Sequence, residues 1–269
     1  MIINELTCVS GFWQSKNKNG DPNKYFEWFK NTLQINCPYI FFGDAKTIER
    51  VKLIRDKYPT HYIEHSIENF FTNKEEYINK FVIEEGHVPS IEANMIYHEK
   101  IFMLKKAIEI NPFNSEYFKW IDAGICCYRR SLPPQVSFPN LKIYNLLPKN
   151  KFIFAASNPY LTNKEFKMYL PNRNIHHYIA GTSYLIHKNI INDIINCYIF
   201  HLNKLDKIYA DQNVLTEVHR TIPNLFHSVY DTRKICDCKG YGFVTKYLFG
   251  ENEEIQIDLL KNNIKFKLI

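Results

Sequence analysis

The sequence predicts an α/β protein in which a mixed, mostly parallel sheet is flanked by helices. Three observations favour this fold class. Apolar runs and amphipathic segments alternate over the first 65 residues, a strong helical pattern at 90–110 leads into an apolar run at 117–124, and similar pairs recur towards the C-terminus. Because no internal repeat and no linker rich in glycine or serine interrupts the chain, we expect a single domain over residues 1–269.

The N-terminal part is predicted to alternate strands with helices. Short runs of apolar, β-branched and aromatic residues predict the strands, and apolar residues at helical spacing predict the helices between them. In chain order these elements are a strand at 6–12, a helix at 24–35, a strand at 38–44, a helix at 45–58 and a strand at 61–65. Strands that are separated by helices in this way pair in parallel.

The clearest predicted helix covers residues 90–110, with Ser90 as its candidate cap and Asn111-Pro112 as its stop. The stretch "YFKWIDAG" predicts a strand at 117–124 after it. The remaining predicted elements are a strand at 151–157, a strand leading into a helix over 178–205, and a helix leading into a strand over 209–229.

Composition and charge argue against several classes of function. The formal charge of +6 is spread along the chain without a dense basic cluster, which disfavours a nucleic-acid partner. The patterns of P-loop NTPases, dinucleotide-dependent oxidoreductases, zincins and α/β-hydrolases do not occur. The seven cysteines have no disulfide-framework spacing, the N-terminus lacks a secretion-signal pattern, and no apolar stretch is long enough to predict a transmembrane segment. We therefore expect a cytoplasmic location.

The stretch "YFKWIDAGICCYRR" (117–130) places Asp122 directly after an aromatic-rich strand. Ligands of open α/β sheets bind at the carboxyl ends of the strands, which is where this aspartate is expected. Ala123 and Gly124 leave room beside its carboxylate. Such a carboxylate can bind a divalent cation, accept a hydrogen bond from a ribose hydroxyl or cap the following segment, and composition alone leaves these three roles open.

The same stretch carries a resemblance to known proteins. "EYFKWIDAGI" resembles the segment of GT-A glycosyltransferases in which a strand ends in an Asp-x-Asp motif that holds the metal and the nucleotide sugar. More closely, "YHEKIFMLKKAIEINPF", "FKWIDAGI", "IAGTSYLI" and "YADQNVLTEV" resemble, in that order, the HtrL/YibB (WlaTC-like) family, which is regarded as a family of glycosyltransferases. With the N-terminal "TCVSGFW", the resemblance covers most of residues 6–230.

This resemblance implies a GT-A-like, Rossmann-type fold, with a nucleotide-binding half over 1–124 and a half for the donor sugar and the acceptor over 125–269. It also implies a transferase that moves a sugar from a nucleotide-sugar donor, UDP-linked by preference, to a glycan or protein acceptor. A noncatalytic module that binds nucleotide sugars or carbohydrates on a degenerate GT-A scaffold is the alternative, because Gly124 stands where the second aspartate of Asp-x-Asp would be.

A divalent metal, Mn²⁺ or Mg²⁺, is implied at Asp122. Because Gly124 supplies no carboxylate, such a metal would depend on the donor phosphates, water and one more protein ligand. His227 takes the place of the late histidine ligand of some GT-A enzymes, although a lone histidine beside Phe226 is also typical of a packed core. Lys100 could neutralise a diphosphate leaving group, or it could extend past its apolar neighbours to solvent.

Four residues near the N-terminus are implied in nucleotide binding. Gly11 ends the first strand, where the base or ribose binds in this fold, and Phe12 or Trp13 could stack on the base or belong to the core. Asp44 ends the second strand and could contact the base or ribose, but "GDAKTIE" also fits a helix N-cap.

Asp211 and Gln212 are the implied catalytic residues, because GT-A enzymes carry an acidic residue at the start of a helix that faces the donor sugar. Asp211 would act as the base on the acceptor hydroxyl in an inverting enzyme, and in a retaining one Asp211 or Gln212 would support the oxocarbenium-like centre. The alternative is an aspartate favoured by the helix dipole. Gly181 would let the donor sugar approach the backbone.

Overall fold

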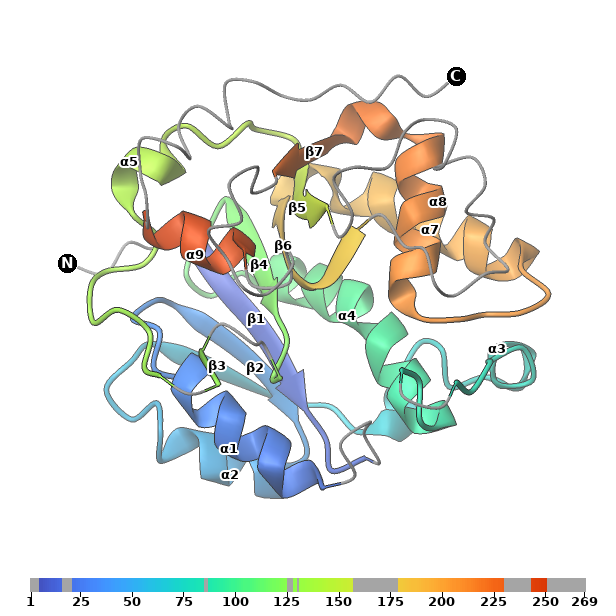
Figure 1. Ribbon diagram of the computed structural model, residues 1–269, viewed down its shortest axis with the longest axis horizontal. Coiled ribbons are helices and arrows are strands. Elements are labelled where there is room, and N and C mark those ends of the chain that lie inside the picture. Colours follow the sequence, from blue (N-terminus) through green and yellow to red (C-terminus); the bar gives the residue numbers. More distant parts are fainter. Residues whose placement is uncertain are drawn as a thin grey trace.

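The computed structural model describes residues 5–15, 21–84, 87–124, 128–129, 131–156, 179–229 and 243–250. In this part of the chain, seven strands form one sheet with helices on both faces (Figure 1). In spatial order the strands are β3 (Thr60–Glu64), β2 (Tyr39–Gly43), β1 (Leu6–Phe12), β4 (Tyr117–Ile121), β6 (Ile179–His187), β5 (Phe152–Ala156) and β7 (Phe226–Val229).

The sheet is mixed and mostly parallel. The strands β3, β2, β1 and β4 pair in parallel, β6 is antiparallel to both β4 and β5, and β7 is parallel to β5. The predicted fold class is therefore confirmed. The sheet includes strands from both predicted halves of the chain, so a continuous hydrogen-bonded ladder joins them.

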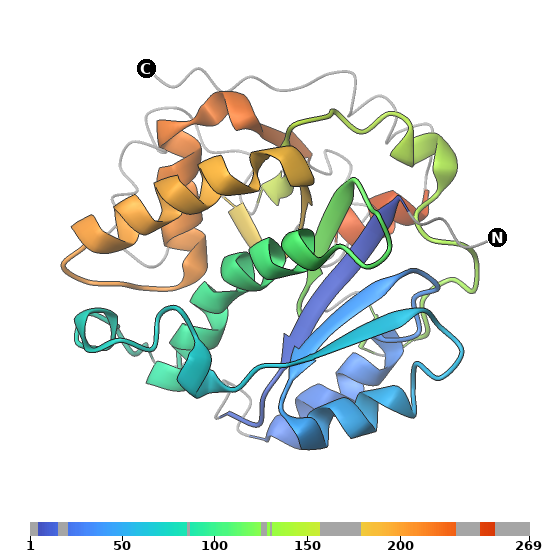
Figure 2. The same ribbon diagram turned by 180° about the vertical axis from the view of Figure 1, so that it is seen from behind.

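Helices cover both faces of the sheet. Within the described ranges they are α1 (Pro22–Thr32), α2 (Ala45–Lys52), α3 (Glu75–Ile78), α4 (Ile91–Ile110), α5 (Leu141–Tyr144), α7 (Ile191–Lys204), α8 (Asp211–Thr221) and α9 (Phe243–Phe249), with short 3₁₀ turns at Ile67–Asn69, Lys188–Ile190 and Pro223–Leu225. Apolar residues of α4, α7 and α8 pack on one face, and those of α1, α2, α5 and α9 pack on the other. Seen from behind, α4 crosses the sheet with α7 beside it (Figure 2). None of these helices is long and apolar enough to cross a bilayer.

The predicted elements are present, but α1 and α2 end earlier than their apolar spacing predicts. They stop at Thr32 and Lys52 rather than at 35 and 58. Arg55 accounts for the end of α1, because it is buried and donates to the main-chain oxygens of Leu33 (2.5 Å), Cys37 (2.8 Å) and Ile35 (3.2 Å). Those carbonyls face the guanidinium and do not continue the helix.

Side chains alternate between the two faces of the sheet along β4, and this alternation sets the direction of the Asp122 side chain, which follows the strand. Phe118 and Trp120 pack on the α4 face, whereas Tyr117 and Ile121 pack on the α1 face. Asp122, directly after the strand, continues the series towards α4. The sheet therefore directs its carboxylate at the helix that carries Lys100.

The predicted helix at 90–110 is confirmed with its cap. The Ser90 hydroxyl accepts a hydrogen bond from the backbone N–H of Ala93 at 3.1 Å, and Asn111 ends α4 in the left-handed conformation at φ 35°. The helix is buried on most sides because it lies between the sheet and α7.

We predict that Ser90→Ala lowers the free energy of unfolding by about 1 kcal/mol, because it removes this capping hydrogen bond. Urea unfolding at neutral pH measures the effect. Ser66 precedes a 3₁₀ turn without capping it, so Ser66→Ala is the control, and we expect a change within about 0.5 kcal/mol for it. Equal effects of the two substitutions would contradict the role of Ser90.

Candidate functional site

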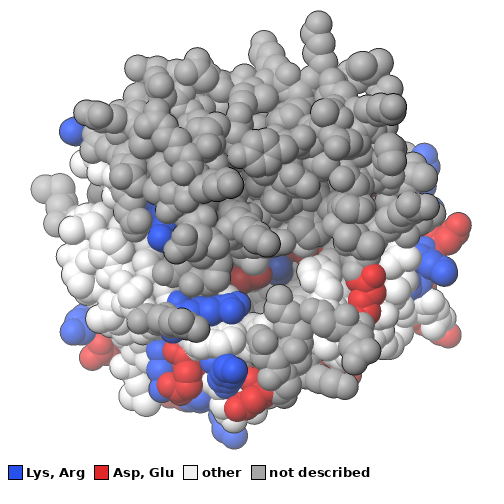
Figure 3. Space-filling model, viewed as in Figure 1, with Lys and Arg blue, Asp and Glu red and all other residues white. Residues whose placement is uncertain are grey.

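A cavity of about 310 Å³ opens at the carboxyl ends of β1 and β4. Because β6 runs antiparallel to β4, the first half of β6 lies at the same edge, and the N-terminal parts of α4 and α8 complete the walls. Acidic and basic side chains lie together at the floor of a recess in this face of the molecule (Figure 3). This is the edge at which open α/β sheets bind their ligands.

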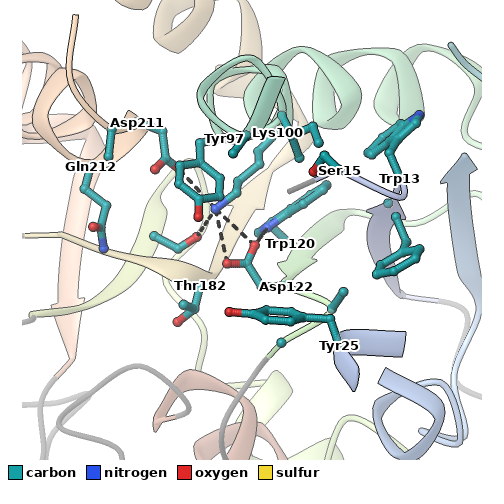
Figure 4. A pocket seen from close by; sticks show the side chains of 18 of the residues that line it. Trp13, Ser15, Tyr25, Tyr97, Lys100, Trp120, Asp122, Thr182, Asp211 and Gln212 are labelled. Atoms are coloured by element: carbon teal, nitrogen blue, oxygen red, sulfur yellow. Dashed lines mark hydrogen bonds and ion pairs between the residues drawn. The ribbon is translucent and has the colours of Figure 1, made fainter. Parts of the chain in front are cut away.

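A lysine held between two carboxylates forms the centre of the cavity (Figure 4). The ammonium of Lys100 lies 3.0 Å from Oδ1 and 3.2 Å from Oδ2 of Asp122, and 3.3 Å from Oδ2 of Asp211. It also donates to the main-chain oxygen of Gly181 at 3.2 Å. The indole N–H of Trp120 donates to Oδ1 of Asp122 at 2.5 Å, so this carboxylate is held from two sides.

Burial and charge set the protonation of this cluster. Burial alone lowers the pKa of Lys100, but the carboxylates of Asp122 and Asp211 together raise it above its ordinary value, so the lysine stays charged. Burial raises the pKa of Asp211 to about 6, against the opposing effect of Lys100. The side chain of Asp122 is 22% exposed and that of Asp211 only 5%, so Asp122 is the carboxylate that faces the opening.

Gly181 lies against the two predicted catalytic residues. A methyl group on Gly181 would lie 2.7 Å from Cγ of Gln212, which is too close, and 3.2 Å from Oδ2 of Asp211, which is a tight contact. Asp211 and Gln212 begin α8, and Gln212 reaches the cavity beside Asp211 (Figure 4). The glycine therefore allows α8 to approach β6 and to present both side chains.

Aromatic side chains form the remaining walls. The ring of Trp13 covers Gly11, and its N–H donates to the main-chain oxygen of His65 at 2.8 Å. The ring of Tyr25 covers Gly124, because a methyl group there would lie 2.6 Å from Cε1 of the tyrosine. The room that Gly124 was expected to leave beside Asp122 is thus filled by a phenol ring.

Two predicted nucleotide-binding residues have evident structural roles. Phe12 borders the cavity, but it is 6% exposed and packs against Phe26 and Phe29 in the core. Asp44 caps α2 by accepting from the N–H of Thr47 at 2.7 Å. Asp44 lies in a neighbouring hollow that shares Trp13 with the cavity, and not in the cavity itself.

The structure does not bring His227 to Asp122. His227 lies on β7, which is three strands from β4, and at about 4.8 Å per strand the two strands are roughly 14 Å apart. It does not line the cavity, and burial lowers its pKa to about 4. These features are those of a packed core histidine.

The described residues do not fit a divalent metal ion at Asp122. The ammonium of Lys100 lies where such a cation would bind between Asp122 and Asp211, and Trp120 donates to the same carboxylate. Nowhere in the described ranges do three histidine, cysteine or acidic side chains form a ligand group for a metal ion.

The lining residues that the sequence did not single out include Tyr25, Tyr97, Arg129 and Thr182. Tyr97 could have been found, because it lies one helical turn before Lys100 on the same face of α4, and Lys100 lies 5.1 Å from its ring centroid. Tyr25 and Thr182 lie on α1 and β6, and only the fold places them near Asp122, whereas Arg129 follows Asp122 within the stretch 117–130.

The sequence matches a known protein family over most of its length. A family model described as "Bacterial protein of unknown function (HtrL_YibB)" matches residues 6–235. The chain belongs to the HtrL_YibB family. The match includes β1, β4, α4, β6 and α8, which together hold Lys100, Asp122 and Asp211. None of the curated proteins compared with this sequence matches it.

Several solved structures are similar to this one. Mouse xyloside xylosyltransferase 1 has 13% sequence identity and a TM-score of 0.46, covering 91% of this chain and 93% of its own. The 4-diphosphocytidyl-2C-methyl-D-erythritol synthase of Anaerococcus prevotii has 12% identity and a TM-score of 0.43, covering 89% and 96%. Core-mannan synthase A of Aspergillus fumigatus, in a form with Mn and GDP, has 12% identity and a TM-score of 0.43, covering 83% and 72%. At this level of similarity, none of them assigns an activity to this chain.

We predict that Lys100→Met lowers the free energy of unfolding by about 3 kcal/mol or more at pH 8, because it leaves the carboxylates of Asp122 and Asp211 close together without their counter-charge. Lys100 lowers the pKa of Asp211, so the variant has a still higher one. A group whose pKa is raised in the folded state stabilises the fold at low pH, and this stabilisation is lost as the pH rises. The stability loss caused by Lys100→Met should therefore be smaller at pH 5 than at pH 8.

Chemical unfolding at the two pH values tests this expectation. Lys105→Met is the matched control, since Lys105 lies on the same helix and pairs with the exposed Glu109. We expect it to cost less than about 1 kcal/mol at either pH. The double variant Lys100→Met with Asp211→Asn should recover part of the stability. A single Lys100→Met variant as stable as the control would show that the cluster does not need its lysine.

Proposed function

We propose that this protein is a glycosyltransferase that transfers a sugar from a nucleotide-sugar donor, UDP-linked by preference, to a hydroxyl of a glycan or protein acceptor. The observation that carries the proposal is the buried Lys100 held between Asp122 and Asp211 in a cavity at the carboxyl ends of the strands. Membership of the HtrL_YibB family gives no activity by itself, so the proposal rests on what these side chains can do.

The proposed transfer needs a positive charge near the nucleoside diphosphate that leaves. In the proposed transfer, an acceptor oxygen attacks the anomeric carbon of the donor, the bond from that carbon to the phosphate oxygen breaks, and a nucleoside diphosphate leaves. Lys100 would stabilise the charge that develops on the leaving oxygen. Asp122 would hold the lysine and accept from a donor hydroxyl. No divalent metal ion is included, because Lys100 occupies its place.

The acceptor proton needs a base, and Asp211 is suited to this role. Burial raises the pKa of Asp211 to about 6, which is close to the range where a general base works best at neutral pH. Lys100 would keep Asp211 ionised until the proton arrives. Gln212, which borders the same space, would hydrogen-bond the sugar or the acceptor.

Trp13 and Tyr25 would provide the apolar surfaces for the base and the sugar. Trp13 is as buried as Phe12 and packs against Phe70, but it borders both the cavity and the neighbouring hollow, so Trp13 is the better candidate for base stacking. Tyr25 lies over Gly124 at the side of Asp122. Aromatic faces of this kind bind bases and sugar rings without demanding one ligand.

The proposal predicts slow release of nucleoside diphosphate when the protein is incubated with its nucleotide sugar and no acceptor. A panel of UDP-, GDP-, CDP- and dTDP-sugars, followed by chromatography of the released nucleotide, identifies the donor. Asp211→Asn should bind the donor with a thermal shift near that of the wild type and yet release no nucleotide. Donor binding without any turnover by the wild type would instead favour a noncatalytic binding module. Absence of both binding and turnover across the panel would contradict the proposal.

We predict that kcat/KM for transfer rises as pH increases through about 6 and then levels off, because Asp211 must lose its proton before it can act as a base. Asp211→Asn should abolish the rise and lower the rate by roughly 10² to 10⁴-fold. Asp193→Asn is the matched control, since Asp193 also lies in the first turn of a helix but is exposed. A pH profile that stays the same in Asp211→Asn would remove Asp211 from the mechanism.

A further inference from the structure

We infer that Arg129 is the diphosphate-binding residue of this cavity and that the cavity binds the diphosphate group of its ligand without a divalent metal ion. The inference rests on the proposed function and adds to it a residue that the sequence did not indicate. Arg129 lines the cavity together with Asp122 and Gly124, at the side where the chain leaves β4.

Two kinds of contact orient the guanidinium of Arg129 at the cavity wall. Its Nε and Nη2 groups donate to the main-chain oxygen of Gly124 at 3.1 and 2.8 Å, two residues beyond Asp122. The guanidinium lies on the ring of Trp28 in α1, with its central carbon 4.2 Å from the ring centroid. Both contacts fix the plane of the guanidinium without neutralising it. A planar group fixed in this way is preorganised for phosphate oxygens.

The charges of the cavity make Arg129 the available cation. Lys100 is shared between the carboxylates of Asp122 and Asp211, so these three side chains together carry no surplus positive charge. Among the described residues, no carboxylate forms an ion pair with Arg129, and its Nη1 group makes no hydrogen bond. Arg129 is therefore the positive charge without a carboxylate partner that a diphosphate bound beside Asp122 would contact.

The same arrangement explains how a diphosphate can bind without a metal ion. A metal ion would have to replace Lys100 at Asp122, and Lys100 is itself buried and tied to Gly181. The described ranges offer no third ligand from histidine, cysteine or acidic residues. Lys100 stays paired with Asp122, and Arg129, which is held at the main-chain oxygen of Gly124, is the cation left to face a diphosphate in the same cavity.

The test measures binding rather than activity. Dissociation constants for UDP, GDP, CDP and dTDP, for the matching monophosphate and nucleoside, and for inorganic pyrophosphate are measured by calorimetry in buffer with EDTA and again with Mn²⁺. The variants are Arg129→Gln, which removes the charge, and Arg129→Lys, which keeps the charge but not the planar fork. Arg50→Gln is the matched control, because Arg50 also stacks on an aromatic ring of α1, 3.6 Å from the centroid of Phe26, but lies outside the cavity.

We expect the wild type to bind one nucleoside diphosphate in EDTA, with a dissociation constant within about threefold of that in Mn²⁺. Arg129→Gln should weaken this binding at least about tenfold, and Arg129→Lys by less, while binding of the nucleoside stays unchanged. Arg50→Gln should bind like the wild type. If Arg129→Gln does not fold, the test is whether Arg129→Lys binds the nucleoside diphosphate more weakly than Arg50→Gln does.

Two results would overturn the inference and leave the proposed function intact. In the first, both Arg129 variants bind the nucleoside diphosphate as tightly as the wild type. In the second, the wild type binds it in Mn²⁺ but loses it in EDTA. If the wild type binds no nucleoside diphosphate under either condition, the inference and the proposed function both fail.

Discussion

A buried ammonium group with two carboxylates around it is the constraint on which the rest of the site depends. A lysine enclosed in this way is stable only when opposite charge and hydrogen-bond acceptors replace its water, because an unpaired buried charge costs several kcal/mol. Lys100 finds these partners on three different elements: Asp122 after β4, Asp211 at the start of α8 and the main-chain oxygen of Gly181 in β6. The ion cluster therefore fixes how α4, β4, β6 and α8 meet. The cavity is the space that remains where they converge.

The architecture brings these groups together through two features of the sheet. Alternation along β4 turns Asp122 towards α4, and the antiparallel pairing of β6 places Gly181 next to the end of β4, where the N–H of Asp122 donates to the main-chain oxygen of Thr182. The absence of a side chain at Gly181 then lets α8 approach closely enough for Asp211 to reach the lysine. A larger residue there would crowd Gln212 and Asp211.

The elements of the fold could be predicted because each has a local signal. The strand at 6–12, the cap at Ser90 and the helix at 90–110 depend on short-range patterns, and all three are confirmed. The early end of α1 depends on Arg55, whose partners lie far along the chain, and no local pattern could give it. The family resemblance pointed to Lys100, Asp122 and Asp211 separately. Their shared ion cluster and the place of Arg129 depend on contacts between distant elements. The placement of His227 far from Asp122 follows from the strand order, which the sequence alone does not fix.

The glycine at position 124 is packed against an aromatic ring. An aspartate at this position would supply another metal ligand, but its Cβ alone would lie 2.6 Å from the ring of Tyr25. Tyr25 occupies the space that such a side chain would need, and the main-chain oxygen of Gly124 accepts from Arg129. Gly124 therefore contacts the ring of Tyr25 and the guanidinium of Arg129, and nearby Asp122 contacts the ammonium of Lys100. An aspartate at position 124 would crowd the ring of Tyr25, and Asp122 would still be paired with Lys100. A binding site for an anionic ligand whose cations are side chains has a fixed charge before the ligand arrives, and its affinity then depends on pH and ionic strength more than on the supply of metal ions.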